Sequence, residues 1–122
     1  MKPAAKQGDQ VVATDTHLVD GAPMTFPFQG KLVDGLSTTV MVEDAPAAVV
    51  GTKAQNVVIH VPPPGKSFVR PPTNRGVIVG GSSTVFIEDK PAARDGDRAS
   101  TCGDPTDADV GRVVASSKVI VG

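Results

Sequence analysis

The sequence predicts a single, mainly β domain, and three observations support that prediction. The chain has 122 residues, the length of one domain. Thirteen glycines and eleven prolines favour turns and loops over helices. Short β-branched runs recur along the chain, and no window carries a sustained apolar stripe of helical period. We therefore expect short strands joined by turns.

The clearest predicted strands are two similar runs, STTVMVED at 37–44 and SSTVFIED at 82–89. Both are rich in β-branched residues, and GVIVGG and GRVVASSKVIVG have the same character. Two Pro-rich segments, 18–30 and 61–75, are predicted loops because proline fixes φ and lacks a backbone donor. We interpret them as ordered excursions between strands, with mobile loops as the alternative.

One short phrase recurs three times, as KPAAKQGD from Lys2, APAAVVGT from Ala45 and KPAARDGD from Lys90. The stretch 35–60 aligns without a gap with the stretch 80–105. The first copy lacks a preceding strand, whereas the C-terminal strand SSKVIVG lacks a following copy. Joining the two ends of the chain restores the register of a third repeat.

This closure predicts a pseudo-threefold object whose third repeat is split between the termini, all within one domain spanning 1–122. One such unit cannot bury its apolar face alone, but three around an axis can. Val40, Val85 and Val119 share one repeat position, so they all face the core or all face an end of the molecule; we favour the core. The repeat segments are 31–60, 76–105, and 110–122 joined to 1–17.

The repeat also aligns the two histidines of the chain. His17 follows Pro3, and His60 follows Pro46, by the same fourteen residues (17 − 3 and 60 − 46). In the remaining repeat Cys102 lies close to the equivalent position. Equivalent positions converge near an axis, so two imidazoles and a thiolate should meet there. The sequence therefore predicts a metal site made by His17, His60 and Cys102.

Zinc suits this donor set because Zn²⁺ takes histidine nitrogen and cysteine sulfur in tetrahedral sites. The softness of the donors favours zinc but leaves iron and copper open. The fourth ligand stays open between water, Asp104, Asp107 and an unrecognised group. That choice matters because catalytic zinc keeps an open position and structural zinc does not.

The composition reduces the number of plausible classes of function. The apolar residues are mostly Val and Ala, which bury little area each, and one cysteine cannot form an internal disulfide. A thin core of this kind favours a metal or a partner as a staple. A formal net charge of −1 gives no basic footprint for nucleic acid. No signal-peptide or membrane-spanning run is visible, so we expect synthesis in the cytoplasm.

The motif SSTVFIEDKPAARDGD, followed by a cysteine at Cys102, resembles the PAAR-repeat family, named for the Pro-Ala-Ala-Arg found here at Pro91–Arg94. The resemblance implies a small cone-shaped β fold, with a zinc ion near its point held by His17, His60 and Cys102. The chain departs from the family pattern by lacking a third histidine, which leaves the fourth ligand open. The GAPMTFPF and VPPPGKSF insertions look most like the phage-tail-like subgroup.

The resemblance also implies a function. Family members sharpen and cap the trimeric spike of contractile injection systems, either type VI secretion systems or extracellular phage-tail-like particles. We expect one copy per VgrG-like or phage-tail-like spike trimer, release with the particle, transient contact with the target membrane during puncture, and possible effector cargo. The alternative is a metal-dependent hydrolase delivered at the spike tip, because an open zinc position activates water.

Overall fold

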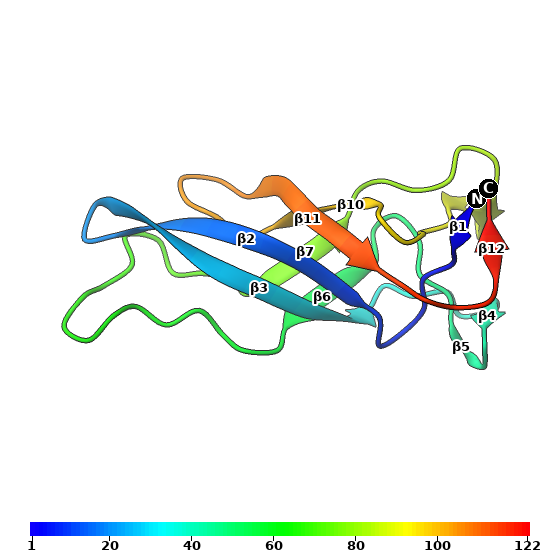
Figure 1. The fold of residues 1–122 in the computed structure, drawn as a ribbon, viewed down its shortest axis with the longest axis horizontal. Coiled ribbons are helices and arrows are strands. Elements are labelled where there is room, and N and C mark those ends of the chain that lie inside the picture. Colours follow the sequence, from blue (N-terminus) through cyan, green and yellow to red (C-terminus); the bar gives the residue numbers. More distant parts are fainter.

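The computed structural model describes residues 1–122 as an all-β molecule, with a barrel at one end and three small hairpins at the other (Figure 1). This agrees with the predicted mainly β class. The structure contains no helix that could cross a membrane. The strands are β1 (Lys2–Pro3), β2 (Gln10–Val19), β3 (Ala22–Asp34), β4 (Met41–Val42), β5 (Ala45–Pro46), β6 (Lys53–Asn56), β7 (Arg75–Ile78), β8 (Phe86–Ile87), β9 (Lys90–Pro91), β10 (Arg98–Thr101), β11 (Ala108–Val114) and β12 (Ile120–Val121).

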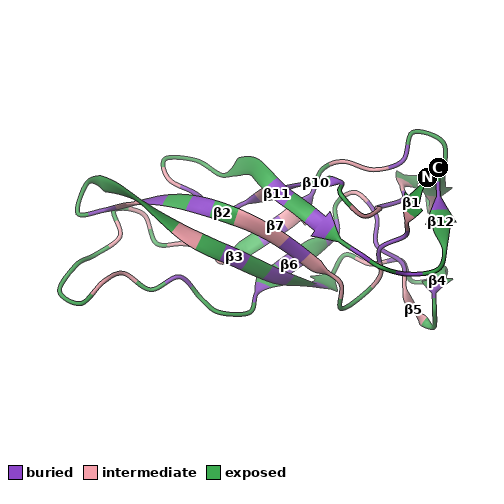
Figure 2. Cartoon of the chain, in the orientation of Figure 1, coloured by how far each residue is buried: buried purple, intermediate pink, exposed green.

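Six strands close the barrel in the order β10-β11-β2-β3-β6-β7, and every neighbouring pair is antiparallel. Closure leaves no long open sheet at this end. Burial alternates along the strands, as the striped ribbons of Figure 2 show. The inward side chains form the larger core cluster, in which Phe28, Leu32 and Ile78 are almost completely buried.

The segment 18–30 is a correction to the sequence prediction, because it forms a long hairpin and not a loop. β2 and β3 pair in continuous register up to a two-residue turn at Asp20 and Gly21, whose φ angles are 50° and 84°. Such turns match the twist of the flanking strands. Gln29 bonds through its N–H to Asn56 on the β6 side, and strand alternation aims Pro27 the same way. Proline is tolerated because its missing donor faces away from β2.

The second Pro-rich segment does remain irregular between β6 and β7. It is nevertheless tied to the β2–β3 hairpin at several points. Phe68 forms an isolated bridge with Val19, the Val69 N–H donates to the Leu18 carbonyl, and the Ser67 carbonyl accepts from Asp20. The segment is therefore an ordered excursion packed against the narrow end of the barrel.

Three equivalent hairpins form the wide end of the molecule. β4 pairs with β5, β8 with β9, and β12 with β1. The residues opposite each proline are equivalent as well, since Met41 faces Pro46, Phe86 faces Pro91 and Ile120 faces Pro3. The third hairpin has no turn, and its place is taken by the two chain ends, which lie side by side (Figure 1). The repeat is thus closed by the termini.

Three alanines mark the pseudo-threefold axis. The Ala5 N–H donates to Ala93, Ala93 to Ala48, and Ala48 back to Ala5, each over 3.0 Å. All three side chains are 1% exposed. Three backbones can meet this closely only where side chains are small, which gives a physical reason for the recurring Pro-Ala-Ala phrase.

The expectation that Val40, Val85 and Val119 face the core is wrong. They are 38%, 36% and 42% exposed. The axis is filled by the alanines, and the smaller core cluster at this end takes other repeat positions, including Val42 and Val121. The three valines therefore lie on the outside of the wide end.

Candidate metal centre

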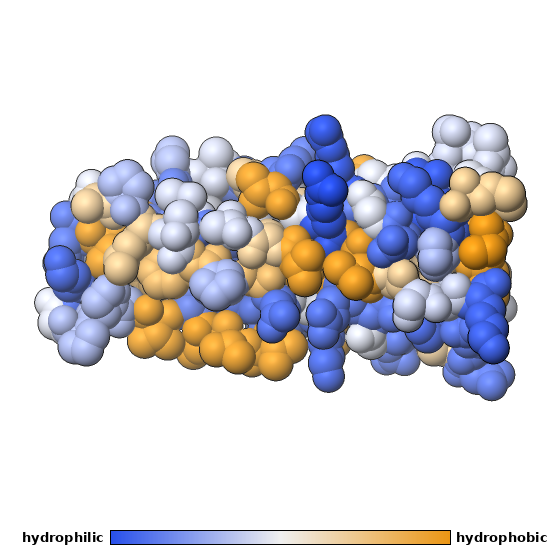
Figure 3. Space-filling model, in the orientation of Figure 1, coloured by the Kyte–Doolittle hydropathy of each residue, from blue (hydrophilic) through white to orange (hydrophobic).

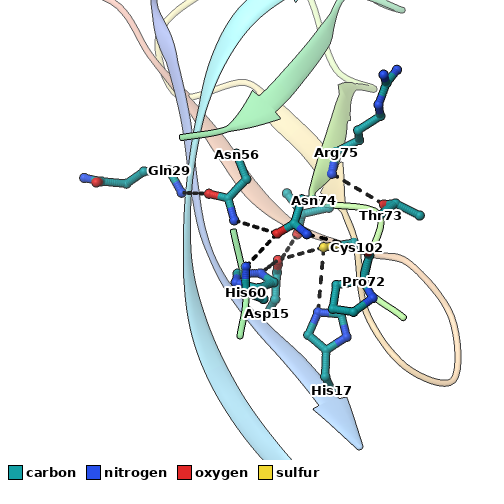
Figure 4. Close-up of polar contacts among 11 residues, drawn as sticks. Asp15, His17, Gln29, Asn56, His60, Pro72, Thr73, Asn74, Arg75 and Cys102 are labelled. Carbon is teal, nitrogen blue, oxygen red and sulfur yellow. Dashed lines mark hydrogen bonds and ion pairs between the residues drawn. The ribbon is translucent and has the colours of Figure 1, made fainter. Parts of the chain in front are cut away.

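Four buried side chains meet inside the narrow half of the molecule: Asp15, His17, His60 and Cys102 (Figure 4). One ligand atom from each lies within 4.8 Å of the others. The structure thus brings together the three residues singled out by sequence and adds Asp15. A cluster of this composition could hold one metal ion.

Strand geometry places the first two donors. Asp15 and His17 are two residues apart on β2, so they point to the same side, and both are almost fully buried while Thr16 between them is exposed. Cys102 follows directly after β10, across the barrel, and His60 lies in the irregular segment after β6. Three barrel walls therefore contribute to one site.

Asp15 is the hub of the cluster. Its Oδ2 lies 2.8 Å from His60 Nε2 and accepts a hydrogen bond from Cys102 Sγ over 3.3 Å. Its Oδ1 accepts from the Thr101 hydroxyl. Cys102 Sγ is also 3.7 Å from His17 Nε2. One carboxylate thereby holds the other donors near a common point.

Two asparagines fix the position of His60, which no strand holds. Asn74 Oδ1 accepts from the His60 backbone N–H over 2.8 Å and from Asn56 Nδ2 over 3.1 Å. Asn56 Oδ1 accepts in turn from the Gln29 N–H on β3 (Figure 4). This chain ties the irregular segment to the barrel wall, so His60 is held in place by side-chain amides.

Three of the four phenylalanines surround the histidines. Phe26 and Phe68 lie 5.7 and 5.5 Å from His17 between ring centroids, and Phe28 lies 6.2 Å from His60. Aromatic walls keep the imidazoles in a dry environment and restrict their rotation. The few large side chains of this chain are thus concentrated at the candidate site.

Burial changes the proton affinities of the cluster. It lowers the pKa of His17, and the neighbouring His60 lowers it further. It raises the pKa of Cys102 to about 11, with Asp15 acting in the same direction. At neutral pH His17 is therefore ready to coordinate, whereas the thiol must lose its proton when a metal binds.

The donor set fits zinc. Two imidazole nitrogens, one thiolate sulfur and one carboxylate oxygen are groups that tetrahedral Zn²⁺ accepts. Both imidazoles direct Nε2 toward the common point. His17 Nδ1 is buried without a hydrogen-bond partner, so Nε2 is the atom that has a polar environment.

The acids considered from sequence lie outside the cluster. Asp107 is half exposed and pairs with Arg70 at 3.6 Å, and Asp104 is not among the clustered donors. Asp15 was missed because symmetry does not reveal it: the equivalent repeat positions hold Val58 and Gly103. The available signal was the Asp-x-His spacing on one predicted strand, which puts both side chains on one face.

A family model described as PAAR motif matches residues 28–106 and 69–122 of this chain. Together the two matches span most of the sequence and include His60, Cys102 and the second and third Pro-Ala-Ala copies. No curated protein matches the chain.

Proposed function

The chain belongs to the PAAR motif family, and on that premise we propose that it is the tip that caps and sharpens the trimeric central spike of a bacterial contractile injection system. A threefold partner needs a threefold surface, and the wide end offers one in a single chain. The observation that carries the proposal is an exposed apolar pair in each of the three hairpins. The pairs are Val40 and Met41, Val85 and Phe86, and Val119 and Ile120.

The exposure of these pairs is large enough to matter for binding. Met41 is 63% exposed, Phe86 58% and Ile120 49%. Apolar side chains on three equivalent sites would be removed from water together when the wide end meets a flat threefold face. Three modest contacts then act as one, because the second and third form within an already bound complex. One chain per spike trimer is the stoichiometry that this geometry supports.

Polar contacts between hairpins support a rigid wide end. Glu88 accepts hydrogen bonds from the Ser37 hydroxyl and the Thr38 N–H of the preceding repeat. The Gly122 carbonyl accepts from Ser82 at the corresponding contact. These bonds link neighbouring repeats at the rim, so the three apolar pairs are presented in a fixed arrangement. A preorganised surface loses little entropy on binding.

The metal centre is assigned a structural role at the opposite end. We infer that His17, His60, Cys102 and Asp15 hold one zinc ion, with Asp15 as the fourth ligand. Four protein donors fill a tetrahedral shell, which is typical of structural zinc and leaves no position for a reacting water. When bound, zinc would crosslink β2, β10 and the segment after β6. This supports a tip without enzymatic activity.

The proposal includes a path for the protein. The chain is made in the bacterial cytoplasm, assembled on the spike of a type VI-like or extracellular phage-tail-like particle, and released with it. The narrow end then meets the target membrane first. The proposal extends to effector cargo that travels with the tip.

The test is the mass of the complex that this chain forms with a trimeric spike protein from the same genome. Native mass spectrometry should give one chain per trimer. Met41→Asp should weaken capping by placing a charge in the apolar contact, and Val114→Asp, at an exposed valine on β11, should not. Three chains per trimer, or no association at all, would contradict the proposal.

A further inference from the structure

An apolar strip runs along one flank of the narrow half, on the segment that follows β6. Its four side chains are Val57, Val58, Ile59 and Val61, and they are 56%, 73%, 59% and 62% exposed. Figure 3 shows a broad hydrophobic area along the lower edge of this half. His60, in the middle of the strip, turns inward to the metal centre and is 7% exposed. The strip is thus the outer side of a ligand-bearing segment.

A groove lies between this strip and β3. Its apolar walls are Phe26 and Pro27 from β3, together with Val58, Ile59 and Val61 of the strip. Gln29, Asn56 and His60 also line it, and no Asp, Glu, Lys or Arg does. Exposed apolar side chains next to an uncharged groove are costly in water, so this flank is a candidate contact surface.

A cationic belt crosses the barrel strands on the side of the strip that faces the wide end. It consists of one exposed basic residue on each of five barrel strands, and none of the five forms an ion pair. The register places Arg98 directly opposite Arg112, and it places Lys31 and Arg75 on the two sides of Gln55. The belt residues are Lys31, Lys53, Arg75, Arg98 and Arg112.

Figure 3 shows a strongly hydrophilic column next to the apolar area, toward the wide end. Acids are scarce near the strip. The sequence from Ala45 to Ile87 contains no Asp or Glu, and the exposed acids on the six barrel strands are Asp34 and Asp109. The belt residues on this flank are Lys31, Lys53 and Arg75, on the neighbouring strands β3, β6 and β7. They outnumber the exposed acids beside them, which are Asp34, opposite Lys53, and Asp107, which is paired with Arg70. The formal net charge of −1 therefore hides a local excess of positive charge on this flank. This positive charge favours anionic binding partners over neutral ones.

The open edge of β3 argues against an added peptide strand as the occupant. β6 pairs with β3 only from Gly30 onward, and Gln29 is bonded to Asn56 and Val57, so the open part of this edge lies before Gln29. Pro23 and Pro27 remove backbone donors from that edge, and strand addition depends on such donors. Fluid acyl chains need no backbone donors, and they fit the apolar side of the groove, formed by Phe26, Val58 and Ile59.

We propose that the apolar strip and the part of the cationic belt on β3, β6 and β7 together form a docking surface for a bilayer with anionic headgroups. The inference rests on the proposed function, in which the narrow end meets a membrane. The strip enters the boundary between headgroups and acyl chains, and the belt lies at the level of the headgroup phosphates. The long basic side chains reach the phosphates while the barrel wall stays above them.

The test is flotation of the purified full chain with vesicles of phosphatidylcholine, with or without phosphatidylglycerol. We expect the chain to float with the anionic vesicles, to bind neutral ones weakly, and to lose binding as salt increases. Lys31→Gln with Lys53→Gln should weaken binding roughly fivefold for each cation removed. The matched control, Lys2→Gln with Lys90→Gln, makes the same change in charge at the wide end and should bind as the wild type does.

Neutral substitutions separate the strip from the belt. Val58→Ser with Ile59→Ser should reduce vesicle binding by about tenfold or more without changing net charge. Val114→Ser, on the opposite wall of the barrel, should have no effect. Metal content and melting temperature confirm that each variant is folded.

Absence of binding to anionic vesicles by a chain that still caps its spike would overturn the docking surface and leave the proposed function intact. Equal loss in the Lys2 and Lys90 control would show that binding follows net charge alone and would also overturn it. A dimer in solution that Val58→Ser dissociates would assign the strip to a second copy of the chain instead.

Discussion

The two ends of this molecule use the same repeat in different ways. At the wide end the repeat is complete, because three hairpins of matching register surround a ring of backbone hydrogen bonds through Ala5, Ala48 and Ala93. At the narrow end the repeat is broken, because two copies carry a histidine and the third does not. The wide end is therefore held together by symmetric backbone hydrogen bonds, and the narrow end by interactions among four different side chains.

The contrast has a physical basis. A surface that meets a threefold partner gains from three equal contacts, so its symmetry is useful. The narrow end has no threefold partner to match, and it has little volume for an apolar core. Four donors around one ion suit such a place, and they need not be equivalent. Each end can be disturbed separately, which makes the comparison testable.

Removal of the metal should have the largest effect. Structural zinc contributes on the order of 10 kcal/mol of apparent binding free energy in small metal domains. Cys102→Ser should therefore abolish most of the metal content and lower the melting temperature more than any other single substitution considered. Elemental analysis and thermal unfolding measure the two quantities. Asp107→Asn is the control, because Asp107 is half exposed and lies outside the cluster. Loss of metal without loss of stability would mean that the ion is not a staple.

Crowding the alanine ring should be the next largest disturbance, and it should leave the metal in place. Ala48→Val adds two methyl groups where the backbones of three repeats meet, and such overpacking costs about 1–3 kcal/mol. Denaturant unfolding should show reduced stability with unchanged metal stoichiometry. Ala22→Val, at an exposed position at the start of β3, should be nearly neutral. Simultaneous loss of metal would show that the two ends are not independent.

Asp15→Asn tests the fourth ligand. The amide keeps the shape of the side chain but loses the charge, so zinc affinity should fall by more than the roughly 10- to 100-fold typical of a lost outer-shell partner, while the chain still folds. Competition with a zinc-binding dye gives the affinity. The same substitution at Asp104 should leave affinity unchanged if Asp15 is the ligand. A larger loss at Asp104 would return the fourth position to that residue.

The pH dependence of zinc binding follows from the cysteine. Burial raises the pKa of Cys102 to about 11 in the metal-free chain, so between pH 7 and 8 the site binds zinc by releasing that proton. The thiolate fraction rises about tenfold with each pH unit in this range, and the zinc affinity should rise with it. Titrations at several pH values measure the slope. Cys102→Ser should remove it, whereas a flat profile in the wild type would mean that the thiolate is not a ligand.

Much of the fold and of the candidate metal site could be predicted from the sequence, because these features depend on local sequence patterns. The β class, the threefold repeat closed by the termini and the convergence of His17, His60 and Cys102 follow from periodicity and repeat alignment. Two features depend on packing that a repeat does not encode. Asp15 has no repeat equivalent, and Pro27 was assigned to a loop because a proline on the outer side of a strand looks the same in sequence as a proline in a loop. Only the register with β2 distinguishes the two.

The smallest expected effect comes from moving the chain ends. In two hairpins the turn is Glu-Asp, at 43–44 and 88–89, with φ between 50° and 68° at all four residues. In the third hairpin Gly122 and Met1 occupy the same places. A chain opened within 61–75, with Gly122 joined directly to Met1, should therefore fold with only a small change in melting temperature.

Positive φ is costly for methionine and tolerated by asparagine, so Met1→Asn should stabilise the permuted chain and have no effect on the original one. The metal content of the permuted chain should be unchanged, because Asn74 still holds the His60 backbone N–H. Failure of both permuted versions to fold, beside a folded original, would contradict the equivalence of the third hairpin.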